Sequence, residues 1–196
     1  MRDTGMPNEE FFAFAGEVID AGRLRMEAGY AQHGTTSTLL HSIAVAYHAE
    51  RMARKLGLCG HIAEIRRAGL LHDYYLYDWH EHSERSAGHA TKHAGRALAN
   101  ALEDYPDLTE LERDAIRCHM FPINPTPPAS EVGWLITVSD KRCAGHETLV
   151  RSGLAHPLVR GLCARHLPDL DLGVSAIDPL ELLVAHATRK AVPEHV

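Results

Sequence analysis

The sequence of 196 residues has few aromatic side chains and no long apolar run. Hydrophobic residues make up 45% of the chain and charged residues 23%, which is the composition of an ordinary globular domain. Because no apolar segment reaches the roughly 18 residues of a membrane-spanning helix, we expect no membrane partner. The N-terminus also lacks the basic-then-apolar pattern of a signal peptide, so we expect a cytoplasmic protein.

The sequence lacks both an excess of positive charge and a closely spaced pair of cysteines. It has 20 Lys and Arg against 26 Asp and Glu, for a formal net charge of -6, so we expect no general binding to nucleic acid. Its cysteines lie far apart, and we predict reduced and mostly buried thiols, as is typical of cytoplasmic proteins. They are Cys59, Cys118, Cys143 and Cys163.

Histidine is abundant by contrast, with 15 residues. Its side chain is the commonest metal ligand among protein side chains and also carries protons near neutral pH. The abundance alone establishes no site, but it is a reason to look for metal-ligand spacing.

Apolar residues recur at the spacing of helical faces, and no segment alternates in the β pattern over a useful length. A Thr109–Glu112 capping box, Ser130 as an N-cap and Gly57 as a C-terminal stop mark helix ends. Residues 74–88 are predicted to form a loop. We predict helices over residues 39–56, 61–73, 90–102, 109–119 and 130–146, one within 9–27, and one that starts at 178–179. The predicted fold class is all-α, in a single domain.

The segment "AGLLHDYYLYDWHEH" contains the strongest local feature, the adjacent pair His72 and Asp73 at the end of an apolar helix. Neighbouring helical residues point about 100° apart. Both can therefore serve one site only if that site lies between their two directions. A carboxylate suits this position because its two oxygens can bridge two metal ions.

Two further candidates lie on helix faces that we expect to be buried. His41 shares its face with Leu40 and Ile43, and Asp140 follows Ile136 by one helical turn. An unpaired carboxylate on a buried face is costly, so Asp140 is expected to have a cation partner.

His93 and His119 lie at helix positions of their own, the first on a helix rich in small residues and the second at the end of the capping-box helix. An isolated histidine is more often satisfied by a hydrogen bond than by a metal ion. Together with the other candidates the set is as compatible with a metal site as with a hydrogen-bonded core.

In this order and spacing the candidates resemble the HD-domain superfamily of metal-dependent phosphohydrolases. The resemblance rests on His41 in "LLHSIAVAYHAERMARKLGL", His72 and Asp73 in "GLLHD", and Asp140 in "WLITVSDK". The phrases "QHG", "HDYYLYDWH", "HMFPIN" and "SDK" resemble one uncharacterised bacterial branch. The resemblance implies an HD-domain helical bundle with its core at residues 33–147. Residues 1–32 would form an N-terminal helical extension, and residues 148–196 would form C-terminal helices that pack on the core.

The resemblance also implies two divalent transition-metal ions. The first would bind His41, His72, Asp73 and Asp140, and the second would bind His93, His119 and the bridging Asp73. Fe, Mn, Co, Ni and Zn all accept such oxygen and imidazole ligands, and the sequence does not choose among them. The implied reaction is hydrolysis of a nucleotide or other small phosphoester by metal-activated hydroxide.

Three residues are predicted to take part in catalysis: Asp73 as the bridging ligand, Lys141 as a phosphate contact and His80 as a pocket residue. Lys141 is equally well interpreted as a solvated surface lysine. Trp79 either lines the pocket or covers the helix end. No role follows from the sequence for His33 or for most of the loop at residues 74–82.

Two other functions use the same ligand types. One is a mixed-valent di-iron oxygenase of the same superfamily, and the other is a non-catalytic, metal-binding regulatory module. Several HD branches follow the His-Asp pair with lysine or Gly-Lys, whereas Tyr74 and Tyr75 follow it here. This difference argues against a close analogy with the GYP cyclic-dinucleotide phosphodiesterases. The sequence predicts no oligomeric state.

Overall fold

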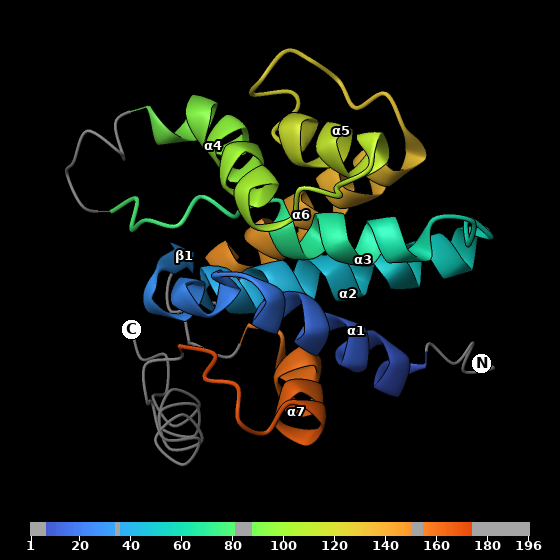
Figure 1. Cartoon of the computed structure of the whole chain (residues 1–196), viewed down its shortest axis with the longest axis vertical. Coiled ribbons are helices and arrows are strands. Elements are labelled where there is room, and N and C mark those ends of the chain that lie inside the picture. The colour runs from blue at the N-terminus through green and yellow to red at the C-terminus, as the bar shows by residue number, and fades with distance from the viewer. Residues whose placement is uncertain (1–6, 34–35, 81–87, 150–154, 174–196) are drawn as a thin grey trace, which may run out of the picture.

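The computed structural model describes residues 7–33, 36–80, 88–149 and 155–173, and this part of the chain is mostly helical (Figure 1). A short antiparallel pair of strands, β1 (Ala31–His33) and β2 (Thr36–Ser37), precedes the second helix. The all-α fold class is confirmed, with this small ladder as an addition that the sequence did not predict. The helices are α1 (Asn8–Ala21), the 3-10 helix η1 (Leu24–Gly29), α2 (Thr38–Leu56), α3 (Ile62–Leu71), α4 (His89–Asp104), α5 (Glu110–Cys118), α6 (Glu131–Leu149) and α7 (Pro157–His166).

Helix α2 runs through the centre of the molecule, between α1 and α7 on one side and α4 and α5 on the other (Figure 1). Its first half is apolar nearly all round, from Leu39 to Tyr47, and buries every side chain. A helix of this kind is stable only when other elements surround it. Helices α3 and α6 pack directly against it.

A glycine allows the close contact between α2 and α3. A Cβ added to Gly69 would lie 2.6 Å from the Cα of Ala46, a backbone atom that cannot move aside easily. The two helices can approach this closely only because Gly69 has no side chain. The contact lies just before the end of α3, where His72 and Asp73 follow.

The predicted helix ends agree with the structure in most places. The Ser130 hydroxyl accepts a hydrogen bond from the Gly133 amide (3.0 Å) at the start of α6, and Gly57 ends α2 with a φ of 75°. The Thr109–Glu112 capping box is present at the start of α5. The helix predicted to begin at residues 178–179 lies outside the described residues.

Two helix positions were left open by the sequence pattern. The helix expected within residues 9–27 is α1, and it ends at Ala21, where Gly22 takes an extended backbone and lies against the Tyr105 ring. Helix α7 lies within residues 148–196, for which the resemblance implied C-terminal helices without giving their bounds. It buries Val159, Leu162 and Cys163 and packs against α1 and α2.

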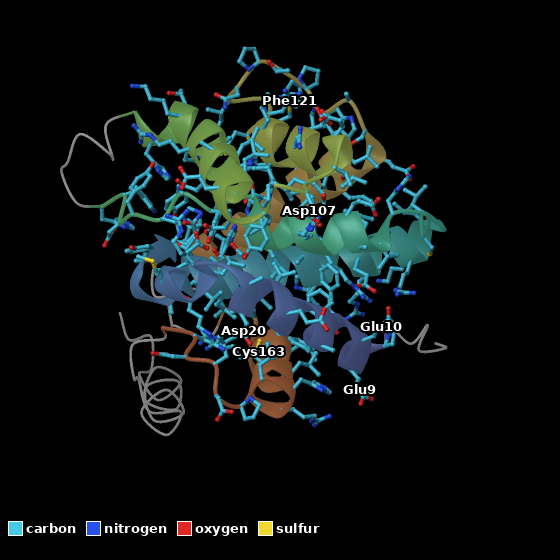
Figure 2. All side chains as sticks on the ribbon, viewed as in Figure 1. Glu9, Glu10, Asp20, Asp107, Phe121 and Cys163 are labelled. Carbon is cyan, nitrogen blue, oxygen red and sulfur yellow. The ribbon has the colours of Figure 1, made fainter. Side chains whose placement is uncertain are left out.

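The described side chains separate as expected for a water-facing surface around an apolar core. Glu9 and Glu10 project from the first turn of α1, whereas Cys163 is buried (Figure 2). Cys118 and Cys143 are also buried and Cys59 is exposed, all four as free thiols, so the prediction of mostly buried cysteines is confirmed. Among the described helices, none has the length and apolarity needed to cross a membrane.

Candidate metal centre

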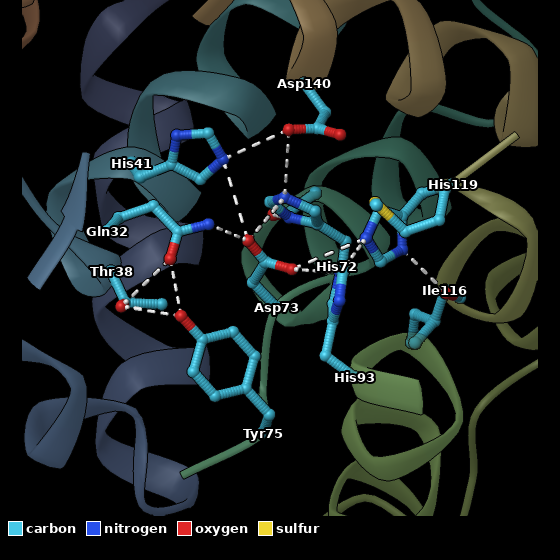
Figure 3. Close-up of polar contacts among 12 residues, drawn as sticks. Gln32, Thr38, His41, His72, Asp73, Tyr75, His93, Ile116, His119 and Asp140 are labelled. Carbon is cyan, nitrogen blue, oxygen red and sulfur yellow. Dashed lines mark hydrogen bonds and ion pairs between the residues drawn. The ribbon is translucent and has the colours of Figure 1, made fainter. Parts of the chain in front are cut away.

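The six predicted metal ligands meet in one buried cluster, although they come from well-separated parts of the chain (Figure 3). At most 5% of any of these residues is exposed. They are His41 on α2, His72 and Asp73 at the end of α3, His93 on α4, His119 at the end of α5 and Asp140 on α6. Convergence from five helices makes this cluster a property of the tertiary packing.

Asp73 lies at the centre of the cluster, and its two carboxylate oxygens face different histidines. Oδ2 is 3.8 Å from His41 Nε2 and 3.5 Å from His72 Nε2. Oδ1 is 3.3 Å from His93 Nε2 and 3.4 Å from His119 Nε2. The histidines therefore form two groups, and one carboxylate joins them.

Asp140 belongs to the group that contains His41 and His72. Its Oδ1 is 3.3 Å from His41 Nε2 and 3.9 Å from His72 Nε2. Its other oxygen is 2.7 Å from the Lys141 ammonium group. One side of Asp73 thus has two imidazoles and a second carboxylate, and the other side has two imidazoles.

The cluster contains polar atoms that the protein itself does not satisfy. Among the described residues, His41 Nε2, His72 Nε2 and Asp73 Oδ1 are buried without a hydrogen-bond partner. Each such atom costs about 1 to 3 kcal/mol. His93 Nε2 and His119 Nε2 lie 3.0 Å apart, so without a cation one of them must hold a proton toward the other. Lone pairs directed at one small space fit the coordination of a metal ion.

The other ring nitrogen of every histidine is held by an acceptor at 3.0 Å or less. This arrangement fixes the tautomer, so that the Nε2 lone pair faces the cluster, and it raises the basicity of the ligand. The acceptors of Nδ1 are Glu147 for His41 (2.9 Å) and the carbonyl groups of Gly69 for His72 (2.8 Å), His89 for His93 (3.0 Å) and Ile116 for His119 (2.8 Å).

The ionisation states of the cluster also suit a cation. Burial lowers the pKa of His72 to about 4, so this imidazole is neutral near pH 7. Burial opposes ionisation of Asp73, but His72 and the other imidazoles outweigh it and hold the Asp73 pKa well below its usual value. Burial likewise opposes protonation of His41, yet Glu147 and Asp140 raise its pKa well above normal. The carboxylates around His41 thus favour a positive charge at this position, which a bound cation would supply.

Two supporting residues were missed from the sequence. Glu147 is buried and lies two helical turns after Asp140 on α6, so extending the Asp140 face by seven residues would have found it. Gln32, on strand β1, donates a hydrogen bond from Nε2 to Asp73 Oδ2 (2.6 Å) and accepts one from the Tyr75 hydroxyl. Nothing in the local pattern marks Gln32, because its position depends on the short β ladder.

A pocket of about 310 Å³ opens over the cluster. Asp73, His93, His119 and Asp140 lie among its lining residues. Much of the remaining wall is apolar and comes from Trp79, Ala90, Met120, Ile123 and Ala144. The cluster is therefore accessible to a small molecule.

Of the other two residues predicted to take part in catalysis, Lys141 lies at the pocket and His80 is not among its described lining residues. Lys141 lines the pocket, with its ammonium group 2.7 Å from Asp140 and 3.2 Å from the His119 carbonyl. His80 is not among the described lining residues: its ring lies 3.8 Å from that of Trp79, and its Nδ1 is 3.1 Å from Asp78. Catalytic roles for Lys141 and His80 stay predictions.

Trp79 from the predicted loop and two further histidines, His89 and His33, also line the pocket. Trp79 lines it and stacks on His89, with ring centres 5.1 Å apart and an angle of 11°. His33 lines it as well, with its ring centre 6.1 Å from that of His41. No role for His33 or His89 followed from the sequence, and the structure places both at the pocket beside the cluster.

Comparison with known proteins identifies one family. The family model described as HD domain matches residues 38–187, which is most of the chain and includes all six clustered residues. No curated protein and no solved structure matches the chain.

Proposed function

The chain belongs to the HD-domain family, whose members are generally metal-dependent phosphohydrolases, and we propose that it hydrolyses a small phosphate monoester, such as a nucleoside monophosphate. The observation that carries this proposal is the central position of Asp73, with one oxygen toward each group of histidines. A carboxylate in this position suits a pair of cations better than a single one.

Under this proposal one divalent transition-metal ion binds His41, His72, Asp73 and Asp140. A second ion binds Asp73, His93 and His119. Fe, Mn, Co, Ni and Zn all accept this set of donors. When bound, such ions acidify a water molecule and offset the charge of the phosphoryl oxygens.

The chain's own residues orient the ligands and the substrate. Glu147 holds the His41 ring and Gln32 holds the Asp73 carboxylate through the hydrogen bonds described above. Lys141 lines the pocket beside Asp140, and its ammonium group is the phosphate contact of the proposal.

The pocket supports a small substrate with one phosphoryl group. Its volume of about 310 Å³ is at the lower end of the range for ligand sites. Lys141 is the one Lys or Arg among the described lining residues, which is little positive charge for a triphosphate. The apolar wall at Trp79, Met120 and Ile123 suits a flat or apolar leaving group, and Trp79 can stack on a base.

A phosphate-release screen tests the proposal. Protein loaded separately with each of the five metals is incubated with nucleoside mono-, di- and triphosphates and with simple monoesters. We expect release from monophosphates and little from triphosphates. Asp73→Asn should abolish the release, and the exposed control Asp169→Asn should leave it unchanged.

Two outcomes would contradict the proposal. One is an absence of phosphate release with every metal. The other is oxygen consumption by the iron-loaded protein without hydrolysis, which would favour the oxygenase alternative.

A further inference from the structure

A second cluster of metal-ligand types lies on the far side of Glu147 from the HD centre. It contains His48 on α2, Cys143 on α6 and His156 just before α7. One donor atom from each lies within 4.8 Å of the other two. We propose that these three residues form a separate transition-metal site of the Cys-His-His type, suited to Zn²⁺.

The donor types and their spacing suit zinc. One thiolate and two imidazoles are among its preferred ligands, and bonds of about 2.0 to 2.3 Å place tetrahedral ligands about 3.5 Å apart. The present spacing of up to 4.8 Å closes to this value with small side-chain movements. The three HD-type donor groups contain no sulfur, so the two sites differ in chemistry.

A pocket of about 300 Å³ gives the cluster access to solvent. His48, Cys143 and His156 line it, together with Ser139 and the exposed His146. The pocket provides an entry path for the ion and space for water or a small ligand in the fourth coordination position.

One nitrogen of the His156 ring is held by a buried carboxylate. Its Nε2 lies 2.6 Å from Glu147 Oε1, and the same carboxylate holds His41 Nδ1. When Nε2 donates to Glu147, Nδ1 carries the free lone pair. A carboxylate behind a histidine is the usual support of a metal-bound imidazole, and Glu147 supports one ring in each cluster.

The backbone of His156 has a conformation that its neighbours in the fold must maintain. Its φ is 59°, a left-handed conformation that is uncommon outside glycine. Local propensity does not favour this conformation, and it puts the His156 side chain beside Glu147 at the start of α7.

The neutral His48 imidazole is able to bind a cation, and the Cys143 thiol must lose its proton to do so. Burial, together with smaller contributions from His156, Arg51 and Arg142, lowers the pKa of His48 to about 4, so His48 is neutral near pH 7. Burial raises the pKa of the Cys143 thiol to about 12. A bound metal ion would therefore displace a proton from this thiol, as at zinc sites in general.

Cobalt titration of the whole chain tests the site. Co²⁺ replaces zinc and gives a strong near-ultraviolet thiolate charge-transfer band only when sulfur is a ligand, which the HD centre cannot supply. We expect wild type to develop this band and Cys143→Ser to lose it. His48→Gln should bind at least about tenfold more weakly, since even supporting residues of metal sites have effects of this size.

Two matched cysteine variants serve as controls. Cys163→Ser removes another buried thiol and Cys59→Ser removes the exposed one, and both should keep the band. The absence of the band in the wild-type protein would by itself overturn the proposal, whatever the variants show. A band that survives in Cys143→Ser, or full affinity in His48→Gln, would also overturn it. Phosphate release is not part of this readout, so the result is independent of the proposed hydrolase activity.

Discussion

Asp73 is the residue on which the candidate metal centre depends most. Its two oxygens face separate pairs of histidines, and Gln32 holds one of them. We predict that Asp73→Ala loses most bound metal at both positions and essentially all phosphate release. Asp73→Asn keeps the volume but loses the charge, and it should bind metal more weakly than wild type. Metal analysis and the phosphate assay measure both effects, and substantial activity in either variant would remove the bridging role.

His93 and His119 provide a second test at the scale of single residues. Their Nε2 atoms lie 3.0 Å apart, on the Oδ1 side of Asp73. We predict that His93→Ala combined with His119→Ala binds one metal ion fewer per chain than its parent. Carrying both changes in Cys143→Ser protein excludes metal at the proposed thiolate site. Unchanged stoichiometry in the double variant would show that these two residues are not ligands.

At the scale of elements, the close packing of α3 on α2 determines where the His72–Asp73 pair lies. A Cβ at Gly69 would lie 2.6 Å from Ala46 Cα, so the helices must separate to accommodate it. Overpacking of this kind usually costs about 1 to 3 kcal/mol. We predict that Gly69→Ala lowers the free energy of unfolding by that amount and also weakens metal binding.

Gly95 on α4 is the matched control for this prediction. A Cβ there would meet nothing within 4 Å, and alanine is a better helix former than glycine by about 1 kcal/mol. Gly95→Ala should therefore be neutral or stabilising in denaturant unfolding, with metal binding unchanged. Equal stability of the two variants would contradict the packing argument.

At the scale of the whole molecule, we predict that metal binding links stability to pH. Burial disfavours the protonated form of His41, but Glu147 and Asp140 outweigh it and raise the His41 pKa. Burial also lowers the pKa of His93, but Asp73 outweighs this effect, so the His93 pKa is raised overall. In the metal-free protein, the stability that these raised pKa values provide is fully present at pH values below the ordinary pKa of histidine. It is lost as the pH rises through the higher pKa of the folded state. A metal ion must displace these protons, so its affinity falls with acid.

The melting temperature with and without chelator measures this linkage. A ligand of the folded state adds about 3 to 4 kcal/mol when it exceeds its Kd by 100 to 1,000-fold. Complete metal removal should therefore lower the melting temperature by several degrees, and by more at about pH 8 than at about pH 6, where protons replace metal on the imidazoles. No response to confirmed metal loss would mean that the six residues satisfy one another without an ion.

The helices and their ends were largely predictable, because local rules govern them. Ser130 and the Thr109–Glu112 capping box act over three residues, and Gly57 adopts its left-handed conformation regardless of distant contacts. The bounds of α7 were not predictable from the same rules, since its start follows the left-handed backbone of His156, which tertiary contacts hold in place.

The sequence by itself determined the helical elements, the ligand types and their order, and it led to the HD family that the comparison identifies over residues 38–187. The resemblance anticipated that Asp73 divides the histidines, but only the tertiary structure decided which Asp73 oxygen faces each group, that Glu147 supports His41, and that Cys143 lies beside two histidines. The physical reason is distance along the chain. Periodicity specifies which face of a helix is buried, but the atoms that meet between helices depend on how closely those helices pack, as at Gly69.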